Sequence, residues 1–383
     1  MYVYLNNAAT TKTDGRVLFK MSKYFSELYE NPMTSNYSPL AKNVEDEMDK
    51  SREYIAKLIN CKSSEIYFTS GGTESDNWAI KGICLKNWEN KGEIISTPIE
   101  HMAIIGTLKT VKKWGFDIKF LPVDKYGIVD PDDLRKLISK KTLLVSVMHA
   151  NNEIGTIEPI EEIGIICKEY GILFHTDAVQ TACHIDIDVQ KMNIDLLSIS
   201  AHKFYGPKGV GALYIRDGVQ IEPFIDGGHQ EKGLRSGTHN SPSIIGMGEA
   251  VNIALKEMEE ERKNVLYLRK MIEERVKEIE GVYINGHPEK RLPNNLSLTV
   301  EKVKAESLLT YLALNGIIVS AGAACSAKEK EPSHVLKAIG VPDDLAYNTI
   351  RISLGKFNYQ KEIEYFNEVF YEGIKKLREF APK

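Results

Sequence analysis

The sequence has few cysteines, and they lie far apart. Its 383 residues include five of them, Cys61, Cys84, Cys167, Cys183 and Cys325, with no Cys-x-x-Cys pair. An odd number at wide spacing argues against a disulfide framework and against a structural zinc site. The nine histidines form no His-Glu-x-x-His motif either, so we expect no metal centre.

The sequence also lacks long apolar runs and an excess of charge. No apolar stretch approaches the length of a membrane span, and residues 1–6 lack the basic and apolar regions of a signal peptide. The formal net charge is −4, with acids and bases interspersed, which is not the footprint of a nucleic-acid-binding protein. We therefore expect a cytoplasmic protein with no nucleic-acid or membrane partner.

Short apolar runs alternate with segments of helical length through the first half of the chain. The expected strands are 65–69, 93–96, 119–123, 143–148, 172–175 and 196–199, and the expected helices are 74–87, 103–113, 131–137 and 160–170. This alternation predicts an α/β fold, with a mostly parallel sheet covered on both faces. Residues 210–215 follow the preceding strand too closely for a crossover helix, so this seventh strand is expected to be antiparallel.

Beyond the sheet the pattern changes. A long charged helix is expected over 241–279, of the kind that bridges domains. It is followed by strands at 296–300, 317–320 and 350–353 and by helices at 304–315 and 359–380. The chain length favours two domains. We expect a large α/β domain at 14–258 and a smaller α+β domain at 1–13 and 259–383.

A lysine follows one of the expected strands directly. In residues 198–211, Lys203 stands after a buried strand, near Ser200, His202 and three glycines. Such a lysine is a candidate Schiff-base lysine, because desolvation or a nearby positive charge helps its ammonium to lose a proton. An exposed lysine in a turn is the usual reading of one lysine taken alone. Other parts of a pyridoxal phosphate site, found elsewhere in the chain, favour the catalytic reading.

Polar groups that suit the two ends of this cofactor follow two other strands. Residues 70–77 contain a glycine pair and open a helix, where Thr73 is expected to cap and free backbone amides attract phosphate. Asp177 needs a cationic partner, which a protonated pyridine nitrogen supplies. Gln180, one turn onward, is in reach of the ring's phenolic oxygen. A plain helix cap and a structural salt bridge are the alternatives.

His101 and Asn152 end two further strands of the expected sheet. His101 is able to stack on a flat ring and to move protons, although a structural histidine is the usual reading of such a residue. The amides in residues 149–155, including Asn152, are able to bind a cofactor or a substrate.

Ordered segments along nearly the whole chain resemble the pyridoxal-phosphate-dependent cysteine desulfurases of fold type I, in the class V aminotransferase group. The segments that carry the resemblance are 4–11 (YLNNAATT), 68–74 (FTSGGTE), 100–101 (EH), 151–156 (NNEIGT), 177–180 (DAVQ), 200–209 (SAHKFYGPKG), 235–238 (RSGT) and 351–355 (RISLG).

The resemblance implies a role for each matching residue. Lys203 is implied as the lysine that binds pyridoxal 5'-phosphate, Asp177 as the partner of the pyridine nitrogen and His101 as the residue stacked on the ring. Asn152 and Gln180 are implied near the phenolic oxygen. Arg351 is implied as the clamp on the substrate carboxylate, which suits its fork of donors, although a surface arginine is the alternative. The residues implied around the phosphate are Gly72, Thr73, Ser200, His202 and, from the second subunit of a homodimer, Thr238.

The segment 320–326, Ser-Ala-Gly-Ala-Ala-Cys-Ser, distinguishes among the activities of this group. A buried, inert cysteine is the usual reading of one cysteine, but these small residues offer little core in which to bury Cys325. The resemblance places the sulfur-accepting nucleophile here, in a loop similar to that of the longer-loop branch serving iron–sulfur assembly. We expect residues 321–332 to form a mobile arm, with Cys325 several ångströms or more from the Lys203 amine.

Two positions depart from the family pattern. Asn6 replaces the usual aspartate, and Asn36 replaces a frequent histidine. Neither position carries the implied chemistry, so the departures concern details of the substrate pocket and the choice of partner.

The resemblance implies a homodimeric cysteine desulfurase that converts L-cysteine to L-alanine. Lys203 or His101 removes the Cα proton, Cys325 takes the sulfur as a persulfide, and a sulfur-acceptor or iron–sulfur scaffold protein receives it. A selenocysteine lyase or a class V aminotransferase is the first alternative, and a transaminase would not need Cys325. A catalytically silent scaffold protein is the second, against which the intact Lys203, Asp177, Cys325 and Arg351 argue.

Overall fold

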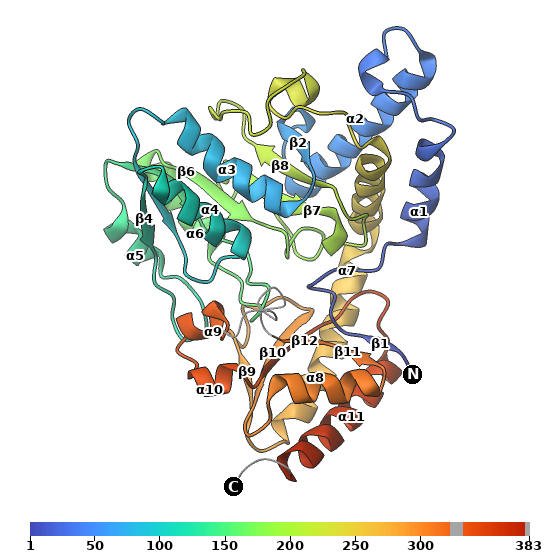
Figure 1. Ribbon diagram of the computed structural model, residues 1–383, viewed down its shortest axis with the longest axis vertical. Helices are drawn as coiled ribbons and strands as arrows, with labels where there is room; N and C mark the ends of the chain where they lie inside the picture. Colours follow the sequence, from blue (N-terminus) through green and yellow to red (C-terminus); the bar gives the residue numbers. More distant parts are fainter. Residues whose placement is uncertain (322–331, 380–383) are drawn as a thin grey trace.

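The computed structural model describes residues 1–321 and 332–379. In this part of the chain a large α/β unit adjoins a smaller α+β unit, and helix α7 (Ser241–Lys277) runs from one into the other (Figure 1). No described helix is both long enough and apolar enough to cross a membrane. Helix α7 confirms the long helix that the sequence predicts over 241–279.

The large unit contains the seven-stranded sheet that the sequence predicts. Among the described residues its order is β2-β8-β7-β6-β5-β3-β4, and only β8 (Gly211–Ile215) is antiparallel to its neighbours. The other strands are β2 (Ile66–Thr69), β3 (Glu93–Ser96), β4 (Asp117–Phe120), β5 (Thr142–Ser146), β6 (Leu173–Asp177) and β7 (Leu196–Ser200). The expected bounds of β4 were wrong: the strand ends before Pro122, which has no N–H for a ladder hydrogen bond.

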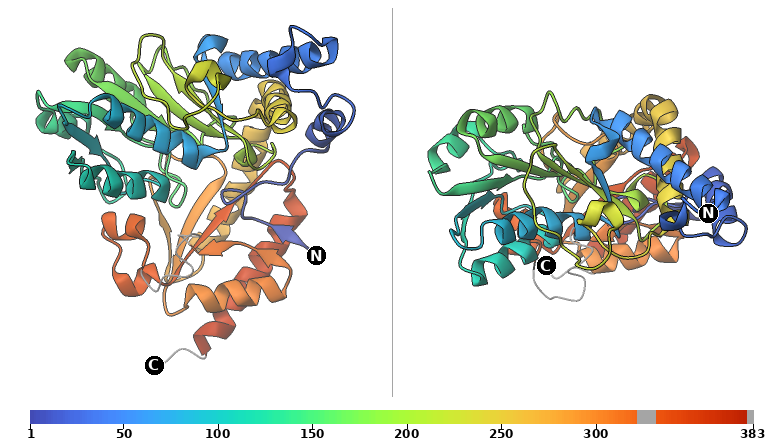
Figure 2. Two further views of the ribbon diagram at one scale, coloured as in Figure 1. Left: turned by 45° about the horizontal axis from the view of Figure 1, so that its top comes forward. Right: turned by 90° about the horizontal axis from the view of Figure 1, so that it is seen from above.

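Alternate residues along the strands divide the apolar core of the large unit between the two faces of the sheet. On β7, Leu196 packs in one cluster, while Leu197 and Ile199 pack in the other. The first face is covered by α3 (Gly72–Lys86) and α4 (Met102–Lys113). The second is covered by α1 (Gly15–Ser22), α2 (Pro39–Ile59), α5 (Pro131–Leu137), α6 (Ile160–Tyr170) and the first half of α7. Figure 2 shows the sheet between these two layers.

The smaller unit is built from both ends of the chain. Its four-stranded sheet has the order β12-β13-β10-β9, and a separate parallel pair joins β1 to β11. These strands are β1 (Val3–Tyr4), β9 (Val282–Asn285), β10 (Asn295–Val300), β11 (Ile317–Ile318), β12 (Ser320–Ala321) and β13 (Thr349–Ser353). The accompanying helices are α8 (Ala305–Leu314), α9 (His334–Ala338), α10 (Asp343–Ala346) and α11 (Gln360–Glu379). One apolar cluster unites Val3 and Leu5 with the second half of α7. The domain boundaries at residues 14 and 259 stay a prediction.

The close approach of α7 to α2 gives a test of the packing. A Cβ added at Gly248 would lie 2.2 Å from Ser51 Oγ and 2.7 Å from Ser51 Cα, so Gly248→Ala must push the two helices apart. We expect a loss of about 1–3 kcal/mol in the free energy of unfolding, measured in urea. The control is Gly106→Ala on α4, where an added Cβ meets no atom within 4 Å. This substitution should raise the free energy of unfolding by about 0.5–1 kcal/mol. Equal effects would contradict the contact.

Candidate active site

A cavity of about 350 Å³ lies where the carboxyl ends of the parallel strands face the smaller unit. Ligands of α/β proteins bind at this edge of the sheet. Ten of the residues predicted for the site line the cavity: Gly72, Thr73, His101, Asn152, Asp177, Gln180, Ser200, His202, Lys203 and Arg351. The fold therefore brings together side chains that are up to 279 residues apart in the sequence.

Lys203 ends a 3₁₀ turn, Ala201–Lys203, that continues directly from β7. Its Nζ donates hydrogen bonds to the carbonyl oxygens of Ala8 at 2.5 Å and Ala9 at 2.9 Å. Its own carbonyl oxygen accepts a hydrogen bond of 3.0 Å from Nε2 of His184. The amine is thus held over the cavity by backbone groups of the N-terminal segment, while His184 fixes the turn behind it.

One end of the cavity is suited to an anion. Among the described residues, no side chain caps α3, because Gly71 is the N-cap and the helix begins at Gly72. The expectation that Thr73 caps was wrong: it lies one residue inside the helix. A Cβ at Gly72 would meet Val179 Cγ2 at 2.6 Å, so only glycine fits there. Backbone amides at a helix N-terminus bind phosphate.

The hydroxyl and imidazole groups beside this turn are uncharged. Ser200 ends β7 and is buried. His202 shares a hydrogen bond of 3.1 Å between its Nδ1 and Thr10 Oγ1. Burial, reinforced by the charges of Lys203 and Lys208, lowers the pKa of His202 to about 4, so this ring is neutral at neutral pH. It is able to donate a hydrogen bond to a phosphate but does not neutralise its charge.

The cavity is also lined by a buried acid. Asp177 ends β6, and its Oδ1 accepts a hydrogen bond of 2.8 Å from the N–H of Val179. Burial raises the pKa of Asp177, while attraction to the protonated form of His101, the hydrogen bond from Val179 and the charge of Lys203 oppose the shift. A cation beside the carboxylate would restore its charge. A buried acid and an uncapped glycine turn in one cavity fit the pyridine nitrogen and the phosphate of pyridoxal phosphate.

His101 is the N-cap of α4, and its Nδ1 accepts a hydrogen bond of 3.2 Å from the N–H of Ala103. Burial lowers its pKa, against the attraction of Asp177. The ring is therefore neutral at neutral pH. Because Nδ1 is an acceptor in this bond, the proton lies on Nε2.

Arg351 lies on β13 of the smaller unit and is only 2% exposed. Its guanidinium donates to the carbonyl oxygen of Asn152 at 3.0 Å and to Oδ1 of Asn6 at 3.1 Å. Asn6 was singled out as a departure from the family pattern. Its amide orients the guanidinium without adding the negative charge that an aspartate would bring.

Two predicted residues are not among those that line the cavity. Thr238 is exposed and lines a separate hollow of about 190 Å³, which also includes Ser70 and Arg235. Cys325 and the proposed mobile arm lie outside the described residues, apart from the arm's two ends. The roles of both residues therefore stay predictions.

Five residues with polar groups in the cavity lining were not predicted from the sequence: Ala8 and Ala9 through their backbone, and Asp76, Glu153 and His334 through their side chains. Ala8 and Ala9 stand in the N-terminal motif, but the sequence gives no sign that their carbonyl groups are used. His334 is fixed by a hydrogen bond of 2.9 Å to the Glu100 carbonyl oxygen. Its position two residues after the loop proline, Pro332, was the available signal.

Comparisons with known proteins agree with this geometry. A family model described as aminotransferase class-V matches residues 3–366. The chain is 47% identical to the cysteine desulfurase IscS of Methanosarcina thermophila over 380 residues, covering 99% of this chain and 94% of that protein. It is 49% identical to the cysteine desulfurase IscS of Dictyoglomus turgidum over 381 residues, covering 99% and 96%.

Solved structures are similar over the same length. A NifS-like protein matches with a TM-score of 0.90 at 41% identity and covers 99% of both chains. A structure described as SspA in complex with cysteine matches with a TM-score of 0.84 at 37% identity, covering 93% of this chain and 100% of that one.

The pKa of Asp76 gives a test of the site's electrostatics. Asp76 is 1% exposed, and burial, followed by the negative charge of Asp177, raises its pKa well above the ordinary value. The folded protein then keeps a proton that the unfolded chain releases above about pH 4, so this carboxyl lowers stability as pH rises from there. In the cofactor-free protein, Asp76→Asn should raise the thermal midpoint at pH 8, with a difference that shrinks toward pH 4. A difference that grows toward pH 4 would contradict this assignment.

Proposed function

The chain belongs to the class V aminotransferase family, and on this premise we propose that it is a pyridoxal-phosphate-dependent cysteine desulfurase. The observation that carries the proposal is the meeting of Lys203, Asp177 and Arg351 in one cavity. The protein, incubated with L-cysteine and a thiol reductant, should release sulfide and alanine in equal amounts. Transfer of the amino group to a keto acid without sulfide would instead indicate an aminotransferase.

Pyridoxal phosphate, when bound, withdraws electrons from the substrate and makes its Cα proton acidic. In this chain Lys203 would hold the cofactor covalently and Asp177 would hold its ring nitrogen. These two roles are supported by the cavity that Lys203 and Asp177 share and by the burial of Asp177. The other proposed cofactor contacts are Gly72, Thr73, Ser200 and His202 at the phosphate, His101 on the ring, and Asn152 and Gln180 near the phenolic oxygen.

Lys203 is better suited than His101 to take the Cα proton. Neutral His101 uses the lone pair of Nδ1 to accept the Ala103 N–H, and its Nε2 carries the proton, so the ring is a donor in this state. The carbonyl oxygens of Ala8 and Ala9 are positioned to stabilise the Lys203 ammonium once it has gained a proton. We therefore assign the base to Lys203 and a donor role to His101.

Arg351 is the proposed binding group for the carboxylate of L-cysteine. It is buried, it lines the cavity, and its guanidinium is oriented by Asn152 and Asn6 through neutral acceptors. A carboxylate that accepts two parallel N–H bonds from a guanidinium is bound in one orientation. This contact would fix the orientation of the substrate in the cavity.

Cys325 is the proposed sulfur acceptor. Its thiolate attacks the substrate sulfur, and the bond between that sulfur and Cβ breaks. The bonding electrons stay with the substrate carbon, which gains a proton and leaves as alanine, while Cys325 keeps the sulfur as a persulfide. The persulfide sulfur would then pass to an acceptor protein for iron–sulfur cluster or thio-cofactor synthesis in the cytoplasm. A selenocysteine lyase on this scaffold would favour selenocysteine strongly over cysteine.

A homodimer with shared sites is the proposed assembly. Thr238 is exposed in this chain and does not line the cavity among the described residues, so a second subunit is needed if it is to bind a phosphate. Large apolar side chains are exposed on the corner formed by α1 and the start of α2, including Phe19 at 84% and Tyr37 at 90%. This corner projects from the large unit (Figures 1 and 2), and such surfaces mark protein interfaces.

The substitutions Lys203→Ala and Cys325→Ala should separate two stages of the reaction. Lys203→Ala should lower sulfide release by at least about 10²–10⁴-fold and should abolish covalent retention of the cofactor after borohydride reduction. Cys325→Ala should abolish sulfide release, yet L-cysteine should still change the cofactor's visible absorbance, because Lys203 remains. Substantial sulfide release by Cys325→Ala would mean that another group takes the sulfur.

The shared site predicts that Thr238→Ala weakens cofactor binding in a protein that stays dimeric. Loss of one hydrogen bond to a phosphate should lower affinity about tenfold, measured by titrating the cofactor-free protein. Sedimentation should give a dimer for the parent and the variant alike. A fully active monomer would refute the shared site.

A further inference from the structure

The connection between β8 and α7, residues 216–240, has an unusual backbone. It carries the segment 235–238, and its one helical stretch is a short 3₁₀ turn. Glu231 and Lys232 inside that turn both have positive φ, 46° and 58°. Side chains other than glycine adopt this conformation at an energetic cost, and such strain persists only where the surroundings impose it.

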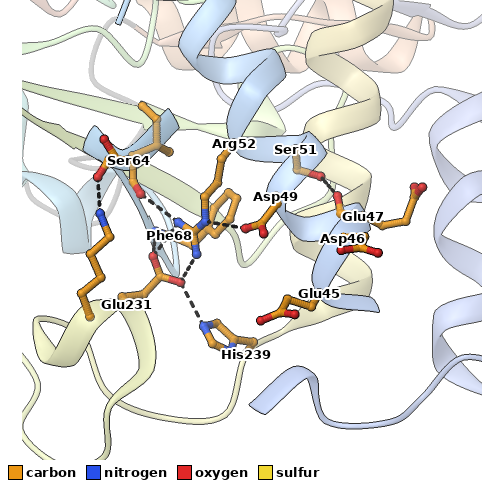
Figure 3. Close-up of polar contacts among 12 residues, drawn as sticks. Glu45, Asp46, Glu47, Asp49, Ser51, Arg52, Ser64, Phe68, Glu231 and His239 are labelled. Carbon is orange, nitrogen blue, oxygen red and sulfur yellow. Dashed lines mark hydrogen bonds and ion pairs between the residues drawn. The ribbon is translucent and has the colours of Figure 1, made fainter. Parts of the chain in front are cut away.

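The carboxylate of Glu231 provides that constraint. Its side chain is 1% exposed, and Figure 3 shows it between Arg52 and His239. Arg52 on α2 donates two parallel hydrogen bonds of 2.8 and 2.6 Å. Nε2 of His239 donates a third at 3.0 Å, and the N–H of Phe68 on β2 a fourth at 2.9 Å. One carboxylate thus ties the connection to a helix and to a strand of the sheet.

This arrangement is held firmly. The guanidinium of Arg52 lies 4.4 Å from the centre of the Phe68 ring and also donates 2.8 Å to the Ile66 carbonyl oxygen. Burial alone would raise the pKa of Glu231, but the bonds from His239 and Arg52 outweigh it and hold the pKa at about 2. Glu231 is therefore ionised at every physiological pH.

The attachment leaves Thr238 exposed between two fixed neighbours. On one side, Arg235 donates to both carboxylate oxygens of Glu74, at 2.8 and 3.2 Å. On the other side, His239 is bound to Glu231. Ser236 adds a hydrogen bond of 2.7 Å to the Gly228 carbonyl oxygen. Thr238 therefore has a defined position although it is exposed and outside regular secondary structure.

We propose that Glu231 is a positioning residue that, through Arg52 and His239, holds Thr238 where it binds the cofactor phosphate of a second subunit. This inference rests on the shared site proposed above. It assigns a function in the partner's site to a buried carboxylate that does not line the cavity of its own chain. The strained turn and the four hydrogen bonds then have a common purpose, because a loop without them would not present one hydroxyl at a fixed point.

The first test compares two matched substitutions. Glu231→Gln should lower the affinity for pyridoxal phosphate about tenfold, the same loss that is predicted for Thr238→Ala. The control is Glu93→Gln on β3, which is separated from β2 by four strands in the sheet order, where a buried glutamate also binds a cation, Lys119, at 2.7 Å. It should leave cofactor affinity unchanged. Equal losses of affinity in the two Glu→Gln variants would overturn the proposal.

The second test uses mixed dimers with different affinity tags. In a dimer of Lys203→Ala with Glu231→Gln, the only site with its lysine belongs to the Glu231→Gln chain and receives Thr238 from an intact loop. Its activity should titrate with pyridoxal phosphate as in the parent. The second dimer joins the parent to a chain that carries both Lys203→Ala and Glu231→Gln. Here the only site with its lysine belongs to the parent chain and receives Thr238 from the altered loop. Its activity should need about tenfold more pyridoxal phosphate for half-saturation.

Each other outcome has one meaning. The reverse order, or equal affinities in the two mixtures, would overturn the role of Glu231. The same mixed dimers made with Thr238→Ala in place of Glu231→Gln test the shared site by itself. If the two dimers differ in cofactor affinity for Thr238→Ala but not for Glu231→Gln, only the new inference is overturned. Failure to form any mixed dimer overturns the proposed assembly as well. If Glu231→Gln does not fold, His239→Gln removes one anchor of the same loop and should give the same order with a smaller difference.

Discussion

Two hydrogen bonds from the Lys203 amine to the carbonyl oxygens of Ala8 and Ala9 join the halves of the active site. The segment that supplies these oxygens is tied to both sides. The N–H of Thr11 donates to the carbonyl oxygen of His202, next to the lysine, and the N–H of Ala8 donates to Oγ of Ser353, two residues beyond Arg351. The spacing between the proposed base and the proposed carboxylate clamp is thereby set by one short turn of the chain, residues 6–11.

A second connection lies behind the lysine turn and makes the junction stiff. The hydroxyl of Tyr205 donates to Glu261 on α7 and accepts the N–H of Lys356 from the smaller unit. The Lys356 ammonium in turn binds Asp14 at 2.6 Å. A hinge motion between the units would break these bonds together with those of the N-terminal segment. A step of the reaction that needs movement is therefore expected to use a local segment and not a hinge motion that opens the whole cleft.

The elements that sequence patterns predicted well are those whose signal is local. The seven strands of the large sheet and helices α3, α4, α5 and α6 were predicted because short apolar runs alternate with helical periodicity, whereas β9 of the smaller sheet was missed. Helix α2 was missed, although Ser38 followed by Pro39 is a helix start and buried residues recur at 44, 48, 51 and 55. Strand β1 could not be found, because its two residues form a strand only by pairing with β11.

The same distinction holds in the site. Residues that follow strands, such as Asp177 and Lys203, were predictable because parallel strands end at one edge. The Ala8 and Ala9 carbonyls act through the backbone, which no residue type reveals. The tautomer of His101 depends on a hydrogen bond from Ala103, and the raised pKa of Asp76 depends on its burial beside Asp177. These properties arise from packing and could be learned only from the folded chain.

The pairing of residues 3–4 with residues 317–318 also governs biosynthesis. The partner of this first strand is made more than three hundred residues later, so the large sheet is able to fold long before residues 3–4 have a strand to pair with. A chain truncated before β11 would also lack Cys325 and Arg351 on β13, the proposed sulfur acceptor and the proposed carboxylate clamp. Unfinished copies would then lack two groups of the proposed site, which is complete only when synthesis is nearly finished.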